Sequence, residues 1–109
     1  MILTHYLTEA EEIVMAAVWE MDHDPVMSEV YDLLREQTAK NWQTPTVSTY
    51  LRRLVQKGYL QMNHVGRDYF YEAQIDRETY MEAYLERFTA RWGDPARQAI
   101  ARAAKKEDA

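Results

Sequence analysis

The stretch TPTVSTYLRRLVQKGYL, residues 44–60, spaces hydroxyl, amide and cationic side chains so that one helical face would carry them. A helix over about residues 45–57 would bury an apolar stripe and turn the polar side chains outward. The predicted outward residues are Thr46, Ser48, Thr49, Arg52, Arg53, Gln56 and Lys57. Arginine and lysine bind phosphates and guanine edges, and serine and threonine hydroxyls bind phosphates or base edges. This pattern favours non-covalent recognition of a nucleic acid.

The charge distribution supports this interpretation, although the formal net charge of the chain is −5. Residues 1–36 contain nine acids and one base, whereas residues 37–71 contain five bases and one acid. Residues 72–109 contain eight acids and seven bases. Because charges more than roughly 8 Å apart are largely screened at about 0.15 M salt, a local basic patch can bind a polyanion.

The sequence contains none of the usual patterns of an enzyme. There is no glycine-rich phosphate loop, no G-x-S-x-G and no H-E-x-x-H, so we expect no catalytic residues and no cofactor. The run Asp22-His23-Asp24 is more typical of a solvated acidic loop than of a metal site, because three adjacent residues rarely converge on one ion. We therefore expect no metal.

The composition indicates one small globular protein that works inside the cell. The chain has no cysteine, hence no disulfide framework and no thiolate metal site. No apolar run approaches the roughly 20 residues that span a bilayer, and no leader-like segment opens the chain. The prediction is a cytoplasmic protein without a membrane partner.

Local signals predict the elements that would hold residues 45–57 in place. Thr8 and Glu11 form a capping-box pattern for a first helix, and Ser28 is the predicted N-cap of a second. Thr44 would cap the third helix, with Pro45 at its first position and Gly58 as its left-handed C-cap. Period-two patterns then predict strands over residues 59–64 and 68–72, joined at residues 65–67.

The remaining third of the chain is predicted to be helical. Asp76 is a plausible N-cap, and Gly93 and Asp94-Pro95 separate two helices. The predicted fold class is α+β, mainly α: a winged helix-turn-helix of three helices plus a β-hairpin wing, with a C-terminal helical dimerisation arm. We predict the DNA-binding domain over residues 1–73 and the arm over residues 74–109.

Three ordered motifs resemble the BlaI/MecI/CopY family of penicillinase and copper-transport repressors. They are LTEAE through VW at residues 7–19, TVSTYLRRLVQKGYL at residues 46–60, and GRDYFY at residues 66–71. The resemblance implies a homodimeric winged-helix repressor on a palindromic operator in double-stranded DNA. It also implies that Thr46, Ser48, Thr49 and Arg52 face the major groove, that Arg67 lies on the wing, and that Arg53 pairs with an acid of the first helix.

Taken together, these inferences give two sets of candidate residues. The predicted DNA-binding residues are Thr44, Thr46, Ser48, Thr49, Arg52, Arg53, Lys57, His64 and Arg67. The predicted dimer-interface residues are Met81, Tyr84, Leu85, Phe88, Trp92 and Ile100. The alternative for this apolar stripe is that it packs back onto its own domain, but symmetric pairing is the commonest way in which such stripes are buried.

Several features depart from the family pattern and leave the inducer open. Ser48 stands where many members have lysine or arginine, the arm is short, and neither an Asn-Phe bond nor a C-terminal cysteine occurs. An unknown inducer or sensor protein is therefore a possible further partner. The alternative hypothesis is a winged helix that serves as a protein-interaction module without DNA binding, which the acidic total charge favours. A pocket lined by Tyr31, Trp42 and Tyr50 is a weaker alternative, because aromatic residues in a small core usually only pack.

Overall fold

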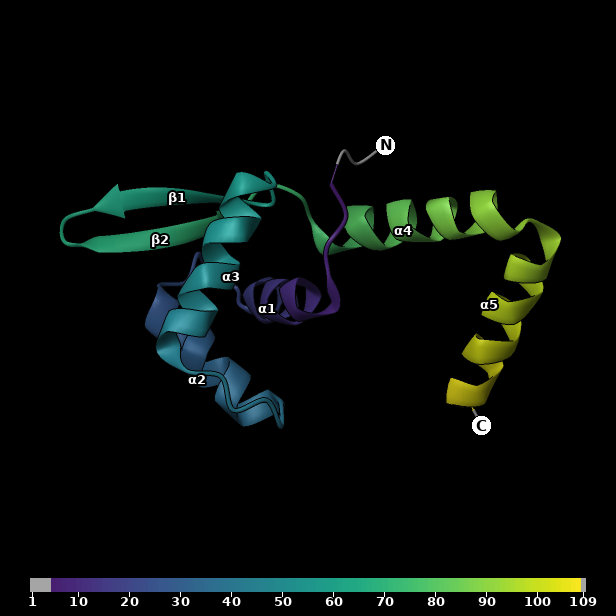
Figure 1. Cartoon of the computed structure of the whole chain (residues 1–109), viewed down its shortest axis with the longest axis horizontal. Helices are drawn as coiled ribbons and strands as arrows, with labels where there is room; N and C mark the ends of the chain where they lie inside the picture. The colour runs from purple at the N-terminus through teal and green to yellow at the C-terminus, as the bar shows by residue number, and fades with distance from the viewer. Residues whose placement is uncertain (1–4, 109) are drawn as a thin grey trace. The chain divides into compact units, whose positions relative to one another are not determined.

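The computed structural model describes residues 5–108 and contains five helices and one hairpin (Figure 1). In chain order these are α1 (Glu9–Glu20), α2 (Met27–Gln37), α3 (Thr44–Gln56), β1 (Leu60–Val65), β2 (Asp68–Ala73), α4 (Arg77–Trp92) and α5 (Asp94–Asp108). This order confirms the predicted, mainly helical α+β fold of three helices, a hairpin and further helices. The chain divides into two compact units, one that ends at Arg77 and one that begins at Glu78.

Helix α1 begins at the predicted capping box. The Glu11 backbone N–H donates to the Thr8 hydroxyl oxygen over 3.2 Å, and the Thr8 backbone N–H donates to the Glu11 carboxylate over 2.8 Å. These two bonds satisfy donors that the start of a helix otherwise leaves unpaired. The capping-box prediction is therefore confirmed.

Helices α2 and α3 begin slightly earlier than the sequence predicts. The N-cap of α2 is Val26 rather than Ser28, because the Glu29 carboxylate reaches back and accepts from the Val26 N–H over 3.0 Å. Helix α3 contains Thr44 as its first residue, and the N-cap is Gln43, whose side chain makes no capping hydrogen bond. The predictions of Ser28 and Thr44 as N-caps are thus wrong by one or two residues.

Glycine 58 ends α3 as predicted. Its φ of 84° lies in the left-handed region, which costs a residue with a Cβ atom about 1–2 kcal/mol. The Gly58 N–H donates to the Val55 carbonyl and the Tyr59 N–H to the Leu54 carbonyl, which is the pattern of a Schellman motif. This motif turns the chain directly from α3 into β1.

The hairpin is slightly longer than predicted, and its connection is shorter. Strands β1 and β2 pair antiparallel from Leu60 opposite Ala73 to Val65 opposite Asp68. Only Gly66 and Arg67 remain in the turn, and Gly66 has a φ of 63°. A positive φ at the first central residue alone fits a type II′ turn, whose twist suits a hairpin.

Three helices and the base of the hairpin bury one core in the first unit. Helix α3 is central to it, because Val47, Leu51 and Leu54 are fully buried. The other helices and the hairpin supply the rest of this core: Val14, Met15, Val18, Val30, Leu34, Tyr59 and Leu60. The Tyr71 N–H also donates to the Pro25 carbonyl over 2.9 Å, which ties β2 to the segment before α2. The core therefore fixes which side of α3 faces outward.

The second unit contains α4 and α5, which meet at Gly93. Tyr80 and Ala83 of α4 and Ala96 of α5 are buried. Much of the apolar surface of α4 is nevertheless exposed. Within residues 5–108, no helix is long and apolar enough to cross a membrane.

Candidate nucleic-acid interface

The outward face of α3 carries the predicted polar residues. Arg52 and Arg53 are exposed, and Thr46, Ser48 and Thr49 are half-buried along the same helix. The Thr49 hydroxyl donates to the Pro45 carbonyl over 2.9 Å, so its oxygen is left to accept a further bond. This face therefore offers guanidinium donors and hydroxyl groups to a ligand in solution.

The N-terminus of α3 is also suited to an anion. Its first turn contains no acidic residue, Thr44 is exposed, and the Gln43 side chain caps no backbone N–H. Pro45 has no N–H. The Thr46 and Val47 N–H groups donate to the Gln43 carbonyl, so it is mainly the helix dipole that makes this end attractive to a phosphate.

Arg53 does not have the partner that the family resemblance implies. Its guanidinium lies over the Tyr50 ring, 5.5 Å from the ring centroid, and within residues 5–108 it forms no ion pair. The Tyr50 ring also packs against Trp42, with 5.1 Å between the ring centroids. The expectation that Arg53 pairs with an acid of the first helix is therefore wrong.

Lys57 is the cation that pairs with α1. Its Nζ lies 2.6 Å from Glu11 Oε1 and donates to the Tyr6 carbonyl over 3.2 Å. The Glu11 side chain is 2 % exposed and the Lys57 side chain 26 %. Lys57 thus points toward the interior and not along the outward face with Arg52. Its place among the DNA-binding residues stays a prediction that this geometry does not favour.

The hairpin carries the remaining predicted contacts. Arg67 lies in the exposed turn, and His64 is exposed one strand residue before Val65. The His64 ring stacks on Tyr69 of the opposite strand, with 4.5 Å between centroids and 16° between planes. This cross-strand pair stiffens the outer half of the hairpin.

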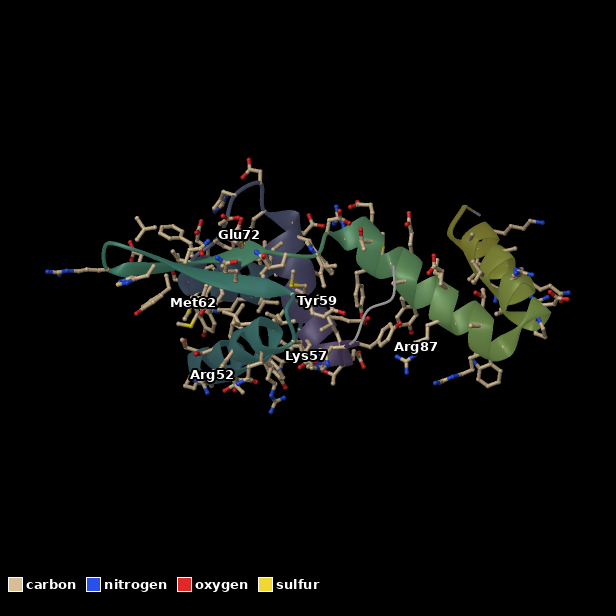
Figure 2. The ribbon with its side chains drawn as sticks, turned by 90° about the horizontal axis from the view of Figure 1, so that it is seen from above. Arg52, Lys57, Tyr59, Met62, Glu72 and Arg87 are labelled. Atoms are coloured by element: carbon tan, nitrogen blue, oxygen red, sulfur yellow. The ribbon has the colours of Figure 1, made fainter. Side chains whose placement is uncertain are left out.

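A groove between α3 and the hairpin contains residues that the sequence analysis missed. It is lined by Ser48, Arg52 and Val55 of α3 and by Met62 and Tyr71 of the hairpin. Arg52 and Met62 are seen on these neighbouring elements in Figure 2. Burial raises the pKa of the Tyr71 hydroxyl, and the positive charge of Arg52 acts in the opposite direction.

The strand register could have identified these residues. Met62 faces Tyr71 and His64 faces Tyr69 across the hairpin, so the four side chains share one face of it. Met62 is 47 % exposed and Tyr69 is 48 % exposed, so an unpaired apolar and aromatic surface adjoins α3. Alternation in the sequence gives this face, but not which side of α3 it adjoins.

The acidic loop after α1 holds His23 between two carboxylates. Its Nδ1 lies 3.0 Å from Asp22 Oδ1 and its Nε2 lies 2.7 Å from Glu29 Oε2. The hydrogen bond to Asp22, followed by that to Glu29, raises the pKa of His23 above its usual value. Among residues 5–108 there is no group of three or more His, Cys, Asp or Glu side chains placed to hold a metal ion.

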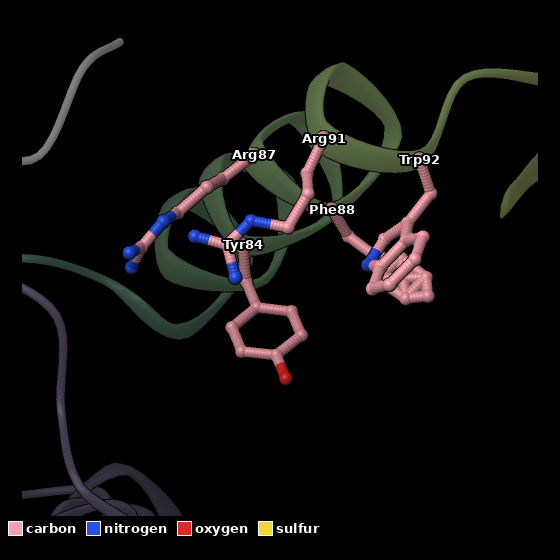
Figure 3. Close-up of a pocket in the computed structure, with 5 residues that line it drawn as sticks. All are labelled: Tyr84, Arg87, Phe88, Arg91 and Trp92. Carbon is pink, nitrogen blue, oxygen red and sulfur yellow. The ribbon is translucent and has the colours of Figure 1, made fainter.

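The predicted dimer-interface residues of α4 form an open apolar surface. Met81 and Tyr84 are each 49 % exposed, Leu85 is 43 % exposed and Trp92 is 61 % exposed. Tyr84, Phe88 and Trp92 line a shallow hollow together with Arg87 and Arg91 (Figure 3). In α5, Ile100 is half-buried.

Helices α1 to α3 and the adjoining hairpin define a winged helix-turn-helix protein. Helix α3 is the second helix of the helix-turn-helix, and its outward side is exposed. The sequence model described as "Penicillinase repressor" matches residues 7–109. The chain belongs to the penicillinase repressor family, which confirms the resemblance drawn from its motifs.

Two individual proteins are similar to this chain. The penicillinase repressor of Bacillus licheniformis is 30 % identical over 86 residues, which are 75 % of this chain and 65 % of that protein. An uncharacterized 16.5 kDa protein in the ptsI 3′ region of Latilactobacillus sakei is 36 % identical over 80 residues, 72 % of this chain and 52 % of that protein. The chain thus spans between about half and two thirds of the length of these relatives.

A solved structure of a relative has the same fold. It is the solution structure of the monomeric form of BlaI from Bacillus licheniformis in complex with the blaP half-operator. The TM-score is 0.61 at 30 % identity, with 73 % of this chain and 94 % of that chain covered.

Proposed function

We propose that this protein is a sequence-specific DNA-binding transcriptional repressor that acts as a homodimer on a palindromic operator. The outward face of α3, with exposed Arg52 and Arg53 beside hydroxyl side chains, carries this proposal. The solved relative with the same fold is bound to a half-operator, which supports the same use of the fold here. Its family is one of repressors rather than enzymes.

In the proposed complex, α3 enters the major groove and the hairpin contacts the DNA backbone. Arg52 and Ser48 line the groove beside the hairpin and would contact base edges, whereas Arg67 at the turn would contact phosphate. A phosphate would also be attracted to the N-terminus of α3 near Thr44 by the helix dipole. The acidic residues elsewhere limit unspecific attraction to DNA, so the local basic patch determines where a polyanion binds.

Selection of bound sequences from random duplexes tests this function. We expect enrichment of a palindrome whose half-sites lie about one helical turn apart, because a two-fold dimer presents two copies of α3. Fluorescence anisotropy at two salt concentrations should show affinity that falls steeply with salt. No enrichment and no salt-dependent binding would instead favour the protein-interaction module.

The exposed surface of α4 supports the homodimer. Monomeric proteins rarely leave a contiguous apolar surface of this kind open, and a second copy presents the same surface for symmetric pairing. Helix α4 places Met81, Leu85 and Trp92 at spacings of four and seven residues, which puts them on one side of the helix.

We expect Leu85→Glu to shift the protein from dimer to monomer, because a carboxylate on this surface would have to be desolvated on pairing. Sedimentation velocity over a concentration series measures the change. Ala90→Glu is the matched control. Ala90 is exposed on the same helix, but it lies about 140° around the helix axis from Leu85 and therefore faces a different side. A monomeric wild-type protein, or equal dissociation of both variants, would contradict the assigned interface.

A further inference from the structure

We propose that Glu11 and Lys57 act together as positioning residues for the DNA-reading face of α3, and that Lys57 does not contact DNA. This inference rests on the proposed function. It reassigns a cation that the sequence places with the DNA-binding residues. Its basis is an ion pair between the first helix and the end of α3.

Glu11 joins two structural roles in one buried carboxylate. Its Oε1 accepts from the Thr8 N–H, which starts α1, and from Lys57 Nζ at 2.6 Å. Burial acts to raise the pKa of Glu11. The hydrogen bonds from Lys57 and Thr8 and the charge of Lys57 outweigh burial and hold this pKa below its usual value. The carboxylate is therefore charged at neutral pH and needs its cation.

Further hydrogen bonds connect the segment before α1 to the same end of α3. Lys57 donates to the Tyr6 carbonyl, and the Tyr59 hydroxyl donates to the His5 carbonyl. Tyr59 itself is 1 % exposed. Figure 2 shows Lys57 and Tyr59 close together on this side of the first unit. The segment from His5 to Glu11 is thus tied to both sides of the Gly58 turn.

The position of this ion pair allows it to affect how α3 binds base edges of DNA. Lys57 is the C-cap of α3, and it follows Arg52 by about one and a half turns and Ser48 by about two and a half turns of the helix. Hydrogen bonds to base edges require donor–acceptor distances of about 2.7–3.2 Å, so a small tilt of α3 would weaken them. An unpaired charge at the C-cap would favour such a tilt, because the charge would gain water by moving outward.

The same geometry argues against a phosphate contact by Lys57. A lysine ammonium has three donors, and two of these are directed at Glu11 and Tyr6. Arg52 and Arg53, by contrast, are exposed and form no ion pair within residues 5–108. Turning these two donors toward a phosphate would leave the buried Glu11 carboxylate with its bond from the Thr8 N–H but without a cation.

The test compares Glu11→Gln, Lys57→Met and the double variant on the selected duplex and on random duplexes. The two single changes alter net charge in opposite directions, so long-range attraction to DNA predicts tighter binding for Glu11→Gln. Positioning predicts that both weaken cognate binding on the order of tenfold, with a smaller loss on random DNA. The salt slope should stay at the wild-type value.

Matched control variants distinguish an effect on the position of α3 from an effect of the changed net charge. Glu9→Gln and Lys40→Met make the same charge changes at exposed residues. We expect neither to lower the preference for the selected duplex. The double variant should bind no worse than either single variant, because the two residues act through one contact. It also leaves no buried charge unpaired, so it should fold even if a single variant does not.

The proposal is overturned if Lys57→Met lowers the salt slope by about one while Glu11→Gln binds normally or more tightly, since that pattern marks a phosphate contact. Amide hydrogen exchange of the free protein gives a reading that needs no DNA. Faster exchange at Gly58 and Tyr59 in Glu11→Gln supports the positioning role, and unchanged exchange there counts against it. Failure of the wild type to bind DNA would refute the proposed function, and the exchange comparison would then still show whether the ion pair holds the end of α3 in place.

Discussion

Replacing Arg52 with alanine is expected to weaken binding to the selected operator by about 1–3 kcal/mol, with a much smaller loss on random duplexes. Arg52 is exposed on α3 and borders the groove shared with Met62 and Tyr71. A guanidinium there can donate two parallel bonds to one guanine edge, which discriminates between bases. Anisotropy titrations on both kinds of duplex measure the loss.

Arg67→Ala is the matched comparison for this prediction. Arg67 occupies the exposed turn of the hairpin, where a phosphate contact carries no base information. We expect this change to weaken binding to all duplexes similarly and to lower the salt slope. Equal losses on cognate and random DNA for Arg52→Ala would show that Arg52 does not read bases.

Replacing Leu51 with alanine is expected to destabilise the first unit by about 2–5 kcal/mol. Leu51 precedes Arg52 in the chain but is fully buried between the helices. Truncating this side chain removes apolar contacts and leaves a cavity that the surrounding side chains fill only in part. Urea unfolding followed by circular dichroism measures the free energy of unfolding.

Val55→Ala provides the comparison for Leu51→Ala on the same helix. Val55 is half-buried and loses only two methyl groups, so its expected cost is smaller. Where enough folded Leu51→Ala protein remains, its preference for the operator over random DNA should persist, because the outward side chains are unchanged. A cost below about 1 kcal/mol would mean that Leu51 is not part of a tightly packed core.

The preference of α3 for a helix, and the side of it that faces outward, could be predicted from the sequence. Apolar residues at helical spacing had to be buried, which left Arg52 and Ser48 on the opposite side. Gly58 and Gly66 marked the two turns, since a positive φ is costly for residues with a Cβ atom. The predicted N-caps of α2 and α3 were less accurate. The N-cap of α2 is Val26, whose N–H donates to the Glu29 carboxylate, and the N-cap of α3 is Gln43, whose side chain makes no capping bond, so neither start is marked by a capping hydroxyl.

The partners of the cations could not be predicted in this way. Glu11 and Lys57 are 46 residues apart, and local pattern says only that one starts a helix and the other ends one. The family resemblance favoured Arg53 for the contact with α1, but Arg53 lies over Tyr50 instead. Which of two nearby cations points inward depends on how α1 crosses α3, and this is a property of packing.

The sequence by itself determined the order of elements, the apolar core of α3 and the family of this protein. Those features depend on periodicity and turn chemistry, which act over a few residues, and on motifs that can be read in order. Only the tertiary structure brought Met62 and Tyr71 beside Arg52 and turned Lys57 toward Glu11. Such contacts join residues that are distant in the chain, and the packed core selects them by fixing the distances between the elements.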